Sequence, residues 1–470
     1  MIDARQRNVA LLVAGCFFME ILDGTIVTTA APRIGVALHV SPTAIGLVIT
    51  SYFIAVAVLI PLSGWMVARF GTRRVFLSAI VIFTVASLLC ATSVSLGELV
   101  AMRVLQGAGG AMMVPVGRLA VLAQTAKPNI MRAMSYIVWP ALLAPVIAPL
   151  AGGLITTYAS WRWLFLINIP LGVIALIAAL RLMPSALATA PPRFDWVGVA
   201  LTCTGLGGLT YTAHLLSEPA AAWSLVLLVG AISVVTLAAT VRHLLRAPAP
   251  LVDLRTLHVR SFRISSTYGS LFFMTFAAVP FLLPLLFESV FRWSAIKAGA
   301  VVLFIFVGNI GIKPATTFLL NRFGFRPILI AATAGLASTI IVSGLFSSTT
   351  PLAIVLVITL LSGVARSVGA TAYMTLAFSD IGESQMRHAN SLAATAQQLA
   401  AGLGVAAATI ALRVGAPLGS LFYSHRTQAS DYTLAFILLA LVSLATTVGA
   451  IKLHPEAGNA VRTVRTKAAA

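Results

Sequence analysis

Two carboxylates stand in the first apolar stretch of the chain, between Phe17 and Val27. Glu20 and Asp23 are three residues apart, so on a helix both point to the same side. An ionisable side chain inside a membrane costs about 3 kcal/mol on insertion scales, so it usually faces water or an opposite charge. The pattern therefore predicts a proton or cation site on a transmembrane helix. The alternative is a helix anchor near the membrane surface, an interpretation that suits Glu20 better than Asp23.

Three basic residues also fall inside apolar segments, and each needs a partner or water. Arg103 is the best candidate to pair with Asp23. Lys313, beside Pro314, either faces a cavity or extends its long stem to the inner surface. Arg366 lies further from the end of its segment, which makes the second option harder. We predict that a substrate cavity is lined by Gln106, Met112, Met113, Lys313 and Arg366. For the two methionines, packing is the more ordinary role.

The composition identifies an integral membrane protein, since 59% of the 470 residues are hydrophobic and only 9% are charged. The net charge of +19 is spread over short loops, which argues against a nucleic-acid-binding domain. The three cysteines have neither metal-ligand spacing nor the pattern of a disulfide framework. No glycine-rich loop ends in Gly-Lys-Ser or Gly-Lys-Thr, so ATP binding is not indicated. We expect no metal, no cofactor and no enzymatic activity.

The apolar segments are long enough to form membrane-spanning helices, for which about 20 residues are needed. We predict fourteen spans, at 9–31, 44–66, 76–95, 98–121, 134–157, 164–183, 196–215, 223–242, 265–287, 297–317, 327–346, 351–375, 389–412 and 431–452. Lys and Arg accumulate in cytoplasmic loops, and a cytoplasmic N-terminus places about 22 of the basic residues inside. These include Arg69, Arg73, Arg74, Arg118, Lys127 and Arg132. Both termini are therefore predicted to be cytoplasmic.

A weak internal repeat predicts a two-fold architecture. The sequence Ala68-Arg-Phe-Gly-Thr-Arg73 recurs as Asn321-Arg-Phe-Gly-Phe-Arg326, each after the second span of its half. We therefore divide the chain into a six-helix half at 1–183, a linker with two inserted helices at 184–264, a second six-helix half at 265–453 and a basic tail at 454–470. Parallel repeats of this kind place a substrate site between the halves, near the midplane of the membrane.

Several motifs give the chain a specific resemblance to a known family. The segment from Gly64 to Arg74 resembles the signature between spans 2 and 3 of the major facilitator superfamily. Arg103-Val-Leu-Gln-Gly107 and Pro149-Leu-Ala-Gly-Gly153 are similar to the next two signatures, the latter typical of exporters. Leu22-Asp-Gly-Thr-Ile-Val27 and the segment from Trp161 to Pro170 resemble the fourteen-span drug:proton antiporter branch. The resemblance covers nearly the whole chain.

This resemblance implies an all-α major facilitator fold in a bacterial cytoplasmic (inner) membrane. It implies a proton-coupling role for Asp23, Glu20 and Arg103, and a conformational role for two sets of motif residues. These are Gly64, Arg69, Gly71, Arg73 and Arg74, and in span 5 Pro149, Gly152 and Gly153. Small residues and a proline in span 5 permit close helix approach and a bend. Ala68 occupies a position where the family usually has Asp. The charge interaction that this motif implies, which would hold one conformation, therefore lacks its acidic residue.

The resulting prediction is a proton-coupled secondary exporter of small amphiphilic molecules or drugs that works by alternating access. The alternative is export of a specific metabolite or metal chelate, such as a carboxylate complex, for which Arg103, Lys313 and Arg366 supply positive charge. A non-transporting membrane sensor is less favoured, because no long loop or appended domain supports it. The expected partners are a small-molecule substrate, protons and the lipid bilayer, without nucleic acid, and we expect a monomer.

Overall fold

The computed structural model describes residues 3–40, 45–141, 143–184, 193–217, 222–422 and 428–462, which are helical with no strand among them. Each span predicted from the sequence contains at least one helix. The first part of the chain forms α1 (Ala4–Ala37), α2 (Gly46–Leu59), α3 (Ser63–Phe70), α4 (Thr72–Thr92), α5 (Leu96–Gln124), α6 (Ile130–Ala141), α7 (Ala144–Tyr158), α8 (Trp163–Leu166) and α9 (Asn168–Leu182). Then follow α10 (Trp196–Ser217), α11 (Trp223–Arg246), α12 (Arg260–Leu285), α13 (Ala295–Gly311), α14 (Lys313–Phe323), α15 (Phe325–Gly344), α16 (Leu352–Ser379), α17 (Met386–Phe422) and α18 (Gln428–Ile451).

The number of evident membrane spans is smaller than the fourteen predicted. Among the described residues, eleven helices are long and apolar enough to cross, or twelve if α13 and α14 form one span bent by 51°. The other two predicted spans are 134–157 and 196–215. The first is divided between α6 and α7, of 12 and 15 residues, each short of the length needed to cross. The second lies in α10, whose glycines and threonines reduce its apolar content.

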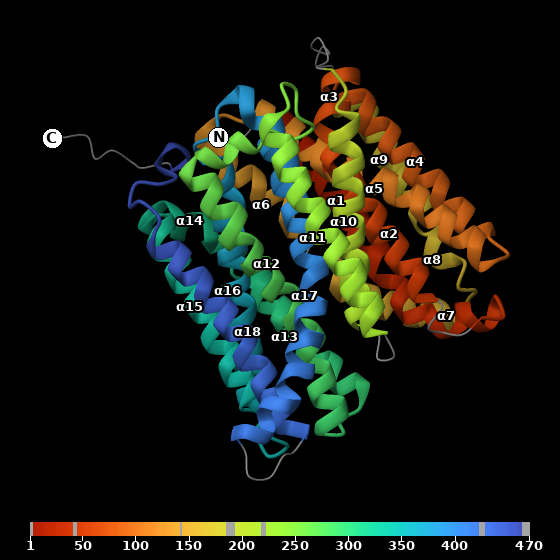
Figure 1. Cartoon of the computed structure of the whole chain (residues 1–470), viewed down its shortest axis with the longest axis vertical. Coiled ribbons are helices and arrows are strands. Elements are labelled where there is room, and N and C mark those ends of the chain that lie inside the picture. Colours follow the sequence, from red (N-terminus) through yellow and green to blue (C-terminus); the bar gives the residue numbers. More distant parts are fainter. Residues whose placement is uncertain are drawn as a thin grey trace.

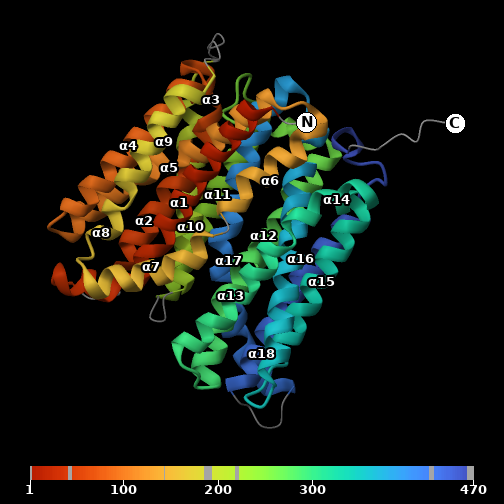
Figure 2. The ribbon, with the colours of Figure 1, turned by 180° about the vertical axis from the view of Figure 1, so that it is seen from behind.

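The helices form two bundles, α1–α9 and α12–α18, which we call the N-terminal and C-terminal bundles. Their ribbons converge at one end of the molecule and diverge toward the other, as Figures 1 and 2 show. α10 and α11 pack on each other, and α10 also contacts α2 of one bundle and α17 of the other. The inserted pair therefore lies along the junction of the bundles.

Both ends of the described chain lie at the end where the bundles converge, which we call the terminal end (Figure 1). Gln6 donates from Nε2 to the carbonyl of Gln124, the last residue of α5. Arg462 donates from Nη2 to the Asn321 carbonyl of α14 at 2.9 Å, and Val461 is fully buried. The described part of the predicted basic tail, up to residue 462, is thus packed against the protein.

The internal repeat has a structural counterpart in two glycine breaks. Gly71 separates α3 from α4 with φ 82°, and Gly324 separates α14 from α15 with φ 85°. Positive φ is costly for residues that carry a Cβ, so glycine is the residue suited to both positions. The two arginine-bearing loops therefore share a backbone geometry that explains why glycine recurs in the motif.

The bundles touch through α17 at the terminal end. Ser391 donates to the carbonyls of Ile60 and Pro61 at 3.3 and 3.1 Å, where α2 gives way to α3. Asn390 donates from Nδ2 to the Pro115 carbonyl of α5 at 2.8 Å. Gly64 lies so close to α17 that an added Cβ would meet Arg387 at 3.5 Å. Hydrogen bonds to backbone carbonyls thus join the bundles here, with Gly64 beside them.

The connectors of the inserted pair join both bundles at this end. Asp195, just before α10, pairs with His243 of α11 at 2.7 Å and accepts from the Leu251 backbone at 3.1 Å. Phe194 packs edge-on against Trp65 of α3, with ring centroids 4.4 Å apart. The Asp253 backbone donates to His388 of α17. The inserted helices are therefore fastened to each bundle through specific polar and aromatic contacts.

Candidate functional site

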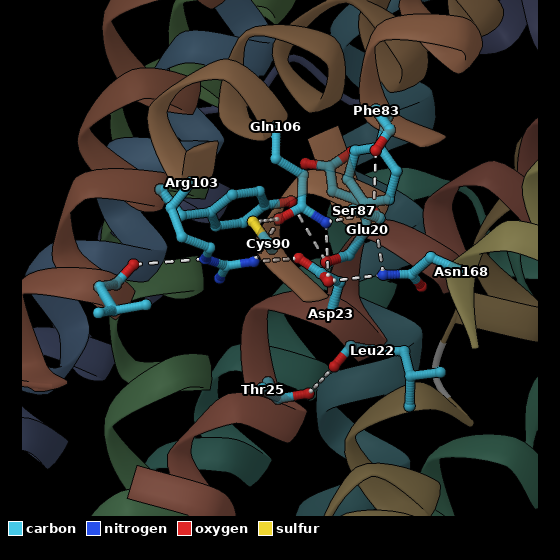
Figure 3. Close-up of polar contacts among 12 residues, drawn as sticks. Glu20, Leu22, Asp23, Thr25, Phe83, Ser87, Cys90, Arg103, Gln106 and Asn168 are labelled. Carbon is cyan, nitrogen blue, oxygen red and sulfur yellow. Dashed lines mark hydrogen bonds and ion pairs between the residues drawn. The ribbon is translucent and has the colours of Figure 1, made fainter. Parts of the chain in front are cut away.

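The deepest polar site of the N-terminal bundle is built around Asp23, which is 1% exposed in the middle of α1 (Figure 3). Its Oδ2 accepts from Arg103 Nη1 of α5 at 2.5 Å. Its Oδ1 accepts from Gln106 Nε2 of α5 at 2.9 Å and from Asn168 Nδ2 at the start of α9 at 2.7 Å. Ser87 of α4 accepts a further hydrogen bond from Gln106 at 2.7 Å. Four helices thus hold one carboxylate with three donors.

Arg103 is fully buried and is held on several sides. Beyond Asp23, its Nη1 donates to Gln106 Oε1 at 2.7 Å and its Nε to the Val48 carbonyl of α2 at 3.3 Å. The guanidinium carbon lies 4.2 Å from the Tyr52 ring centroid, a distance suited to a cation–π contact. This matched pair keeps both charges stable inside an apolar bundle.

The structure brings together Asp23 and Arg103, which sequence reasoning had paired, but it adds Asn168 and Ser87, to which no role had been assigned. Asn168 is fully buried and belongs to the motif between Trp161 and Pro170. A buried asparagine in an apolar span needs partners, so its presence in that motif was the available signal. Ser87 gave no such signal, because a lone serine in a helix commonly bonds its own backbone, as Ser87 also does with the Phe83 carbonyl.

Glu20 lies outside this network, one turn earlier on α1. It is half-buried beside Gly110 of α5, where an added Cβ would lie 3.8 Å from its Cγ. Its Oε2 is buried and has no hydrogen-bond partner. This position between helices does not fit the interpretation of Glu20 as a surface anchor. The two carboxylates therefore differ, since one is fully bonded and the other is not.

The residues predicted to line a substrate cavity are divided between the two bundles. Gln106 is committed to Asp23, and Met113 is fully buried in the core of the N-terminal bundle, with Met112 partly buried against it. Lys313 and Arg366 lie in the C-terminal bundle. Arg118, which we counted among the cytoplasmic basic residues near the end of the predicted span 98–121, is a buried residue of α5 that is 3% exposed.

The C-terminal bundle contains two buried cations that have no carboxylate partner among its described residues. Lys313 donates to Thr371 Oγ1 at 2.7 Å, and Arg366 lies 3.8 Å from the Phe276 ring centroid. Arg366 Nε and Nη1 have no hydrogen-bond partner, and neither do the amide atoms of the fully buried Asn309. Unpartnered polar atoms are not confined to this bundle, since Arg103 Nη2 and Asn168 Oδ1 beside Asp23 also lack a hydrogen-bond partner.

The motif residues occupy distinct positions. Arg73 donates from Nη2 to the Leu180 carbonyl near the end of α9 at 2.7 Å, which ties the loop to that helix. Arg69 and Arg74 are exposed. An added Cβ on Gly153 of α7 would meet no atom within 4 Å, so the predicted close approach is not made there in this conformation. Pro149 and Gly152 also lie in α7, and the Pro149 side chain lies outside the described residues.

Comparison with known proteins agrees with this architecture. The model of the Major Facilitator Superfamily matches residues 13–405. The chain belongs to the major facilitator superfamily. It is therefore a multi-pass membrane transporter of an all-helical fold and not an enzyme.

Curated relatives match over most of this facilitator. "Putative multidrug resistance protein MdtD" of Serratia proteamaculans is 38% identical over 408 residues, covering 85% of this chain and 83% of the relative. The protein of the same name from Pectobacterium atrosepticum is 36% identical over 443 residues, covering 92% and 93%. Bacterial relatives of this kind fit an inner-membrane location.

Solved structures of other facilitators share the fold. The human organic anion transporter MFSD10 gives a TM-score of 0.67 at 14% identity, with 96% of this chain and 100% of that chain covered. The proton:xylose symporter XylE gives 0.65 at 16% identity, with 94% and 95% covered. At such identities these likenesses concern the fold alone.

The buried pair permits a stability test. Asp23→Leu leaves Arg103 charged and unpaired, so we expect a loss of about 3–5 kcal/mol in the free energy of unfolding. The double variant Asp23→Leu/Arg103→Met removes both charges and should recover part of that loss. Denaturant unfolding in mixed micelles measures both. The exposed Arg69→Met serves as the control, with a change within about 0.5 kcal/mol. Additive effects of the two single substitutions would contradict a coupled pair.

Proposed function

We propose that this facilitator is a proton-coupled exporter of small amphiphilic molecules or drugs that alternates access between its two bundles. The observation that carries the proposal is the buried Asp23–Arg103 pair next to the incompletely bonded Glu20, which puts exchangeable charge inside the membrane. The names of the curated relatives support the drug class. In this proposal, the units 1–183 and 265–453 move against each other, and 184–264 joins them.

We also propose that the chain crosses the membrane fourteen times. The argument depends on the end of the molecule at which each segment begins and finishes. α5 ends at the terminal end, where Gln124 meets Gln6, whereas Arg162 bonds the Ser93 carbonyl at the opposite end. The segment of α6 and α7 must therefore traverse the protein. Likewise, Asp195 before α10 pairs with His243 near the end of α11, so the inserted pair returns to its starting end. Because α11 is apolar enough to cross, α10 must cross as well.

In this proposal the terminal end faces the cytoplasm. Arg69, Arg73 and Arg74 of the first repeat loop lie there, as do Arg322 and Arg326 of the second. The bundles converge at this end, so the structure corresponds to a state closed to the cytoplasm. Substrate and protons would then exchange with the outside in this conformation.

Sidedness can be tested with single cysteines in a background lacking Cys16, Cys90 and Cys203. We expect Ser224→Cys, at the exposed start of α11, to react with a membrane-impermeant maleimide added to intact cells. Ala126→Cys, exposed at the terminal end, should react only after the membrane is opened. The reverse pattern would contradict a cytoplasmic terminal end.

If export is coupled to protons, a substitution of Asp23 should reduce uphill transport more than it reduces substrate binding. Asp23→Asn removes the negative charge that Arg103 requires, so we expect uphill export to fall at least about tenfold, because charge-paired carboxylates contribute several kcal/mol. Binding of a neutral amphiphile should persist. The measurement is substrate uptake by inverted vesicles with and without an imposed proton gradient, beside equilibrium binding to purified protein.

A comparison variant is Asn168→Asp, which keeps the size of the side chain but replaces the Nδ2 donor to Asp23 with an acceptor oxygen and adds a second acid. It should reduce export through repulsion without abolishing substrate binding. Gradient-driven export at the wild-type rate in Asp23→Asn would remove Asp23 from the coupling mechanism.

A second candidate function is export of an anionic metabolite or metal chelate. The observation favouring it is the pair of buried cations Lys313 and Arg366, which have no described carboxylate partner, beside the unbonded amide of Asn309. Arg366 and the Lys313 partner Thr371 are five residues apart on α16, a rise of about 7.5 Å. A buried cation is costly without a counter-charge, and an anionic substrate would provide one.

The two candidates differ in how they respond to loss of this charge. If the substrate is anionic, Arg366→Gln should raise the Kd for a tricarboxylate–metal chelate by at least about tenfold, because a charged hydrogen bond is lost. Binding of a cationic dye and of a neutral amphiphile should change little. Binding to purified protein is measured for all three probes. An equal effect on all three would mean that Arg366 supports the fold and would contradict the anionic candidate.

A further inference from the structure

A small apolar cluster joins the inserted pair to both bundles at the terminal end. Its buried members are Leu244 at the end of α11 and Leu251 and Val252 in the connector that follows, each at most 6% exposed. The residues of the two bundles that pack against them are Leu62 and Trp65 from the N-terminal bundle and Leu392 of α17 from the C-terminal bundle. We call residues 249–253 the wedge, since this segment shares the cluster with residues of both bundles.

Asp195, which lies just before α10, holds the wedge in place. Its Oδ2 accepts from the Leu251 backbone at 3.1 Å. Its Oδ1 accepts from the Gly198 backbone at 2.8 Å and pairs with His243 Nε2 of α11 at 2.7 Å. An ionised carboxylate can accept at both oxygens, whereas an amide of the same size can accept at only one. One side chain therefore joins the start of α10, the end of α11 and the wedge.

The attachment to the N-terminal bundle is aromatic. Phe194, next to Asp195, packs edge-on against Trp65 of α3 with ring centroids 4.4 Å apart. On its other side Phe194 packs in the same manner against Trp196 at the start of α10. Trp65 also packs against the apolar cluster that contains Leu251. The position of Asp195 is thus tied to α3 through the residue that precedes it.

The attachment to the C-terminal bundle is polar. The Asp253 backbone donates to His388 Nδ1 at the start of α17 at 3.3 Å. On the opposite side of this turn of α17, Gly64 of α3 lies close enough that an added Cβ would meet Arg387 Cγ at 3.5 Å. The first turns of α17 therefore contact both α3 and the wedge.

A cavity of about 20 Å³ marks the place where the three units meet. Its walls come from Gly64, Trp65 and Ala68 of α3, from Arg193 and Asp195 before α10, from residues 249–251 of the wedge, and from Arg387 and His388 of α17. Among the described residues that line this cavity, Asp195 is the one acid, and it shares the cavity with the cations Arg193 and Arg387. Because α3 contributes Ala68 here, the negative charge at this place comes from the inserted pair.

We propose that the inserted pair is a latch for the terminal end and that Asp195 is its positioning residue. Asp195 keeps the wedge in contact with α3 and α17, which holds the two bundles together at this end. The terminal end can open only if the wedge leaves at least one of the two helices. The proposal rests on the proposed alternating access between the bundles.

The chemistry of the latch suits a contact that opens and closes. Separation of the wedge from either bundle exposes the apolar side chains of Leu251 and Val252, at a cost that scales with the area exposed. The hydrogen bond to His388 can be replaced by one to water, because the connectors lie at the end of the molecule. Neither step leaves an unpaired charge within the membrane. The latch therefore differs from the Asp23–Arg103 pair, whose separation would do so.

The test measures closure of the terminal end in lipid nanodiscs. Spin labels are placed at Ala126→Cys in the N-terminal bundle and Phe323→Cys in the C-terminal bundle, both exposed at this end, in a background lacking the native cysteines. With Asp195 and Leu251 intact, we expect a short and a long distance, since alternating access requires this end to open. Asp195→Ala and Leu251→Ala should each lower the ratio of short to long distances at least about fivefold, the lower range of conformational coupling.

Further variants assign the effect to the latch. Asp195→Glu keeps the charge and should restore part of the short distance. The double variant Asp195→Ala/Leu251→Ala should resemble the single variants, because both residues act through the same wedge. Glu383→Gln removes an exposed acid before α17, and Leu245→Ala removes an exposed leucine of α11. These two matched controls should leave the ratio unchanged.

A second label pair separates the latch from a general loss of structure. Ala126→Cys and the exposed Val94→Cys lie beyond the two ends of α5, so their distance reports on the N-terminal bundle alone. It should be the same in every variant, and a change in Asp195→Ala would mean that Asp195 supports the fold, which would contradict the latch.

The possible outcomes distinguish the latch from the proposed function. Two distances whose ratio is unchanged in Asp195→Ala and Leu251→Ala would reject the latch alone, as would additive effects in the double variant. A single distance shared by all variants would mean that this end does not alternate, and it would reject both proposals. Uphill export by the protein with its native residues is measured in parallel, and its absence would reject the proposed function whatever the distances show.

Discussion

A charge inside a membrane must be matched, and the Asp23–Arg103 pair shows how the N-terminal bundle meets this constraint. Desolvating both ions is expensive, so the pair is stable only if the remaining donors and acceptors are satisfied. Gln106 and Asn168 supply the further donors to Asp23, and they come from two different helices. The pair therefore joins α1, α2, α5 and α9 into one unit. Its rigidity leaves movement to other parts of the bundle.

The contact between the bundles depends mainly on neutral hydrogen bonds rather than on an ion pair. Ser391 and Asn390 donate to backbone carbonyls, and Gly64 allows α17 to approach without a side chain between them. These neutral contacts are individually weak, at about 1 kcal/mol each. A contact that must open and close in each cycle cannot be as stable as a buried ion pair. Charged side chains also take part, since Arg118 bonds Gln397 of α17 and Arg387 of α17 lies beside Gly64.

Sequence reasoning predicted the helical class, the repeat and the partner of Asp23, because each depends on local pattern or on charge balance. The predicted span 98–121 agrees closely with α5, but the counting of Arg118 among the cytoplasmic charges gave no sign that its side chain is buried. Residue type alone did not reveal that Met113 packs in the core of its bundle or that Gln106 bonds Asp23. Asn168 and the carbonyl of Pro115 acquire roles only when distant helices meet, which no local pattern records.

The two bundles also differ in the balance of their buried charge, and this difference constrains how they work together. In the interior of the N-terminal bundle, the two acids Asp23 and Glu20 accompany the two bases Arg103 and Arg118. In the C-terminal bundle, Lys313 and Arg366 have no described acid beside them. Loss of the Glu20 charge on protonation therefore makes the membrane interior more positive, with the excess facing the junction of the bundles. An anion entering the junction would be favoured after protonation, whereas a cation would be favoured before it. A cationic substrate would therefore compete with the proton, whereas an anionic substrate would bind together with it. Antiport, in which the protein exchanges substrate for a proton, requires that the two compete.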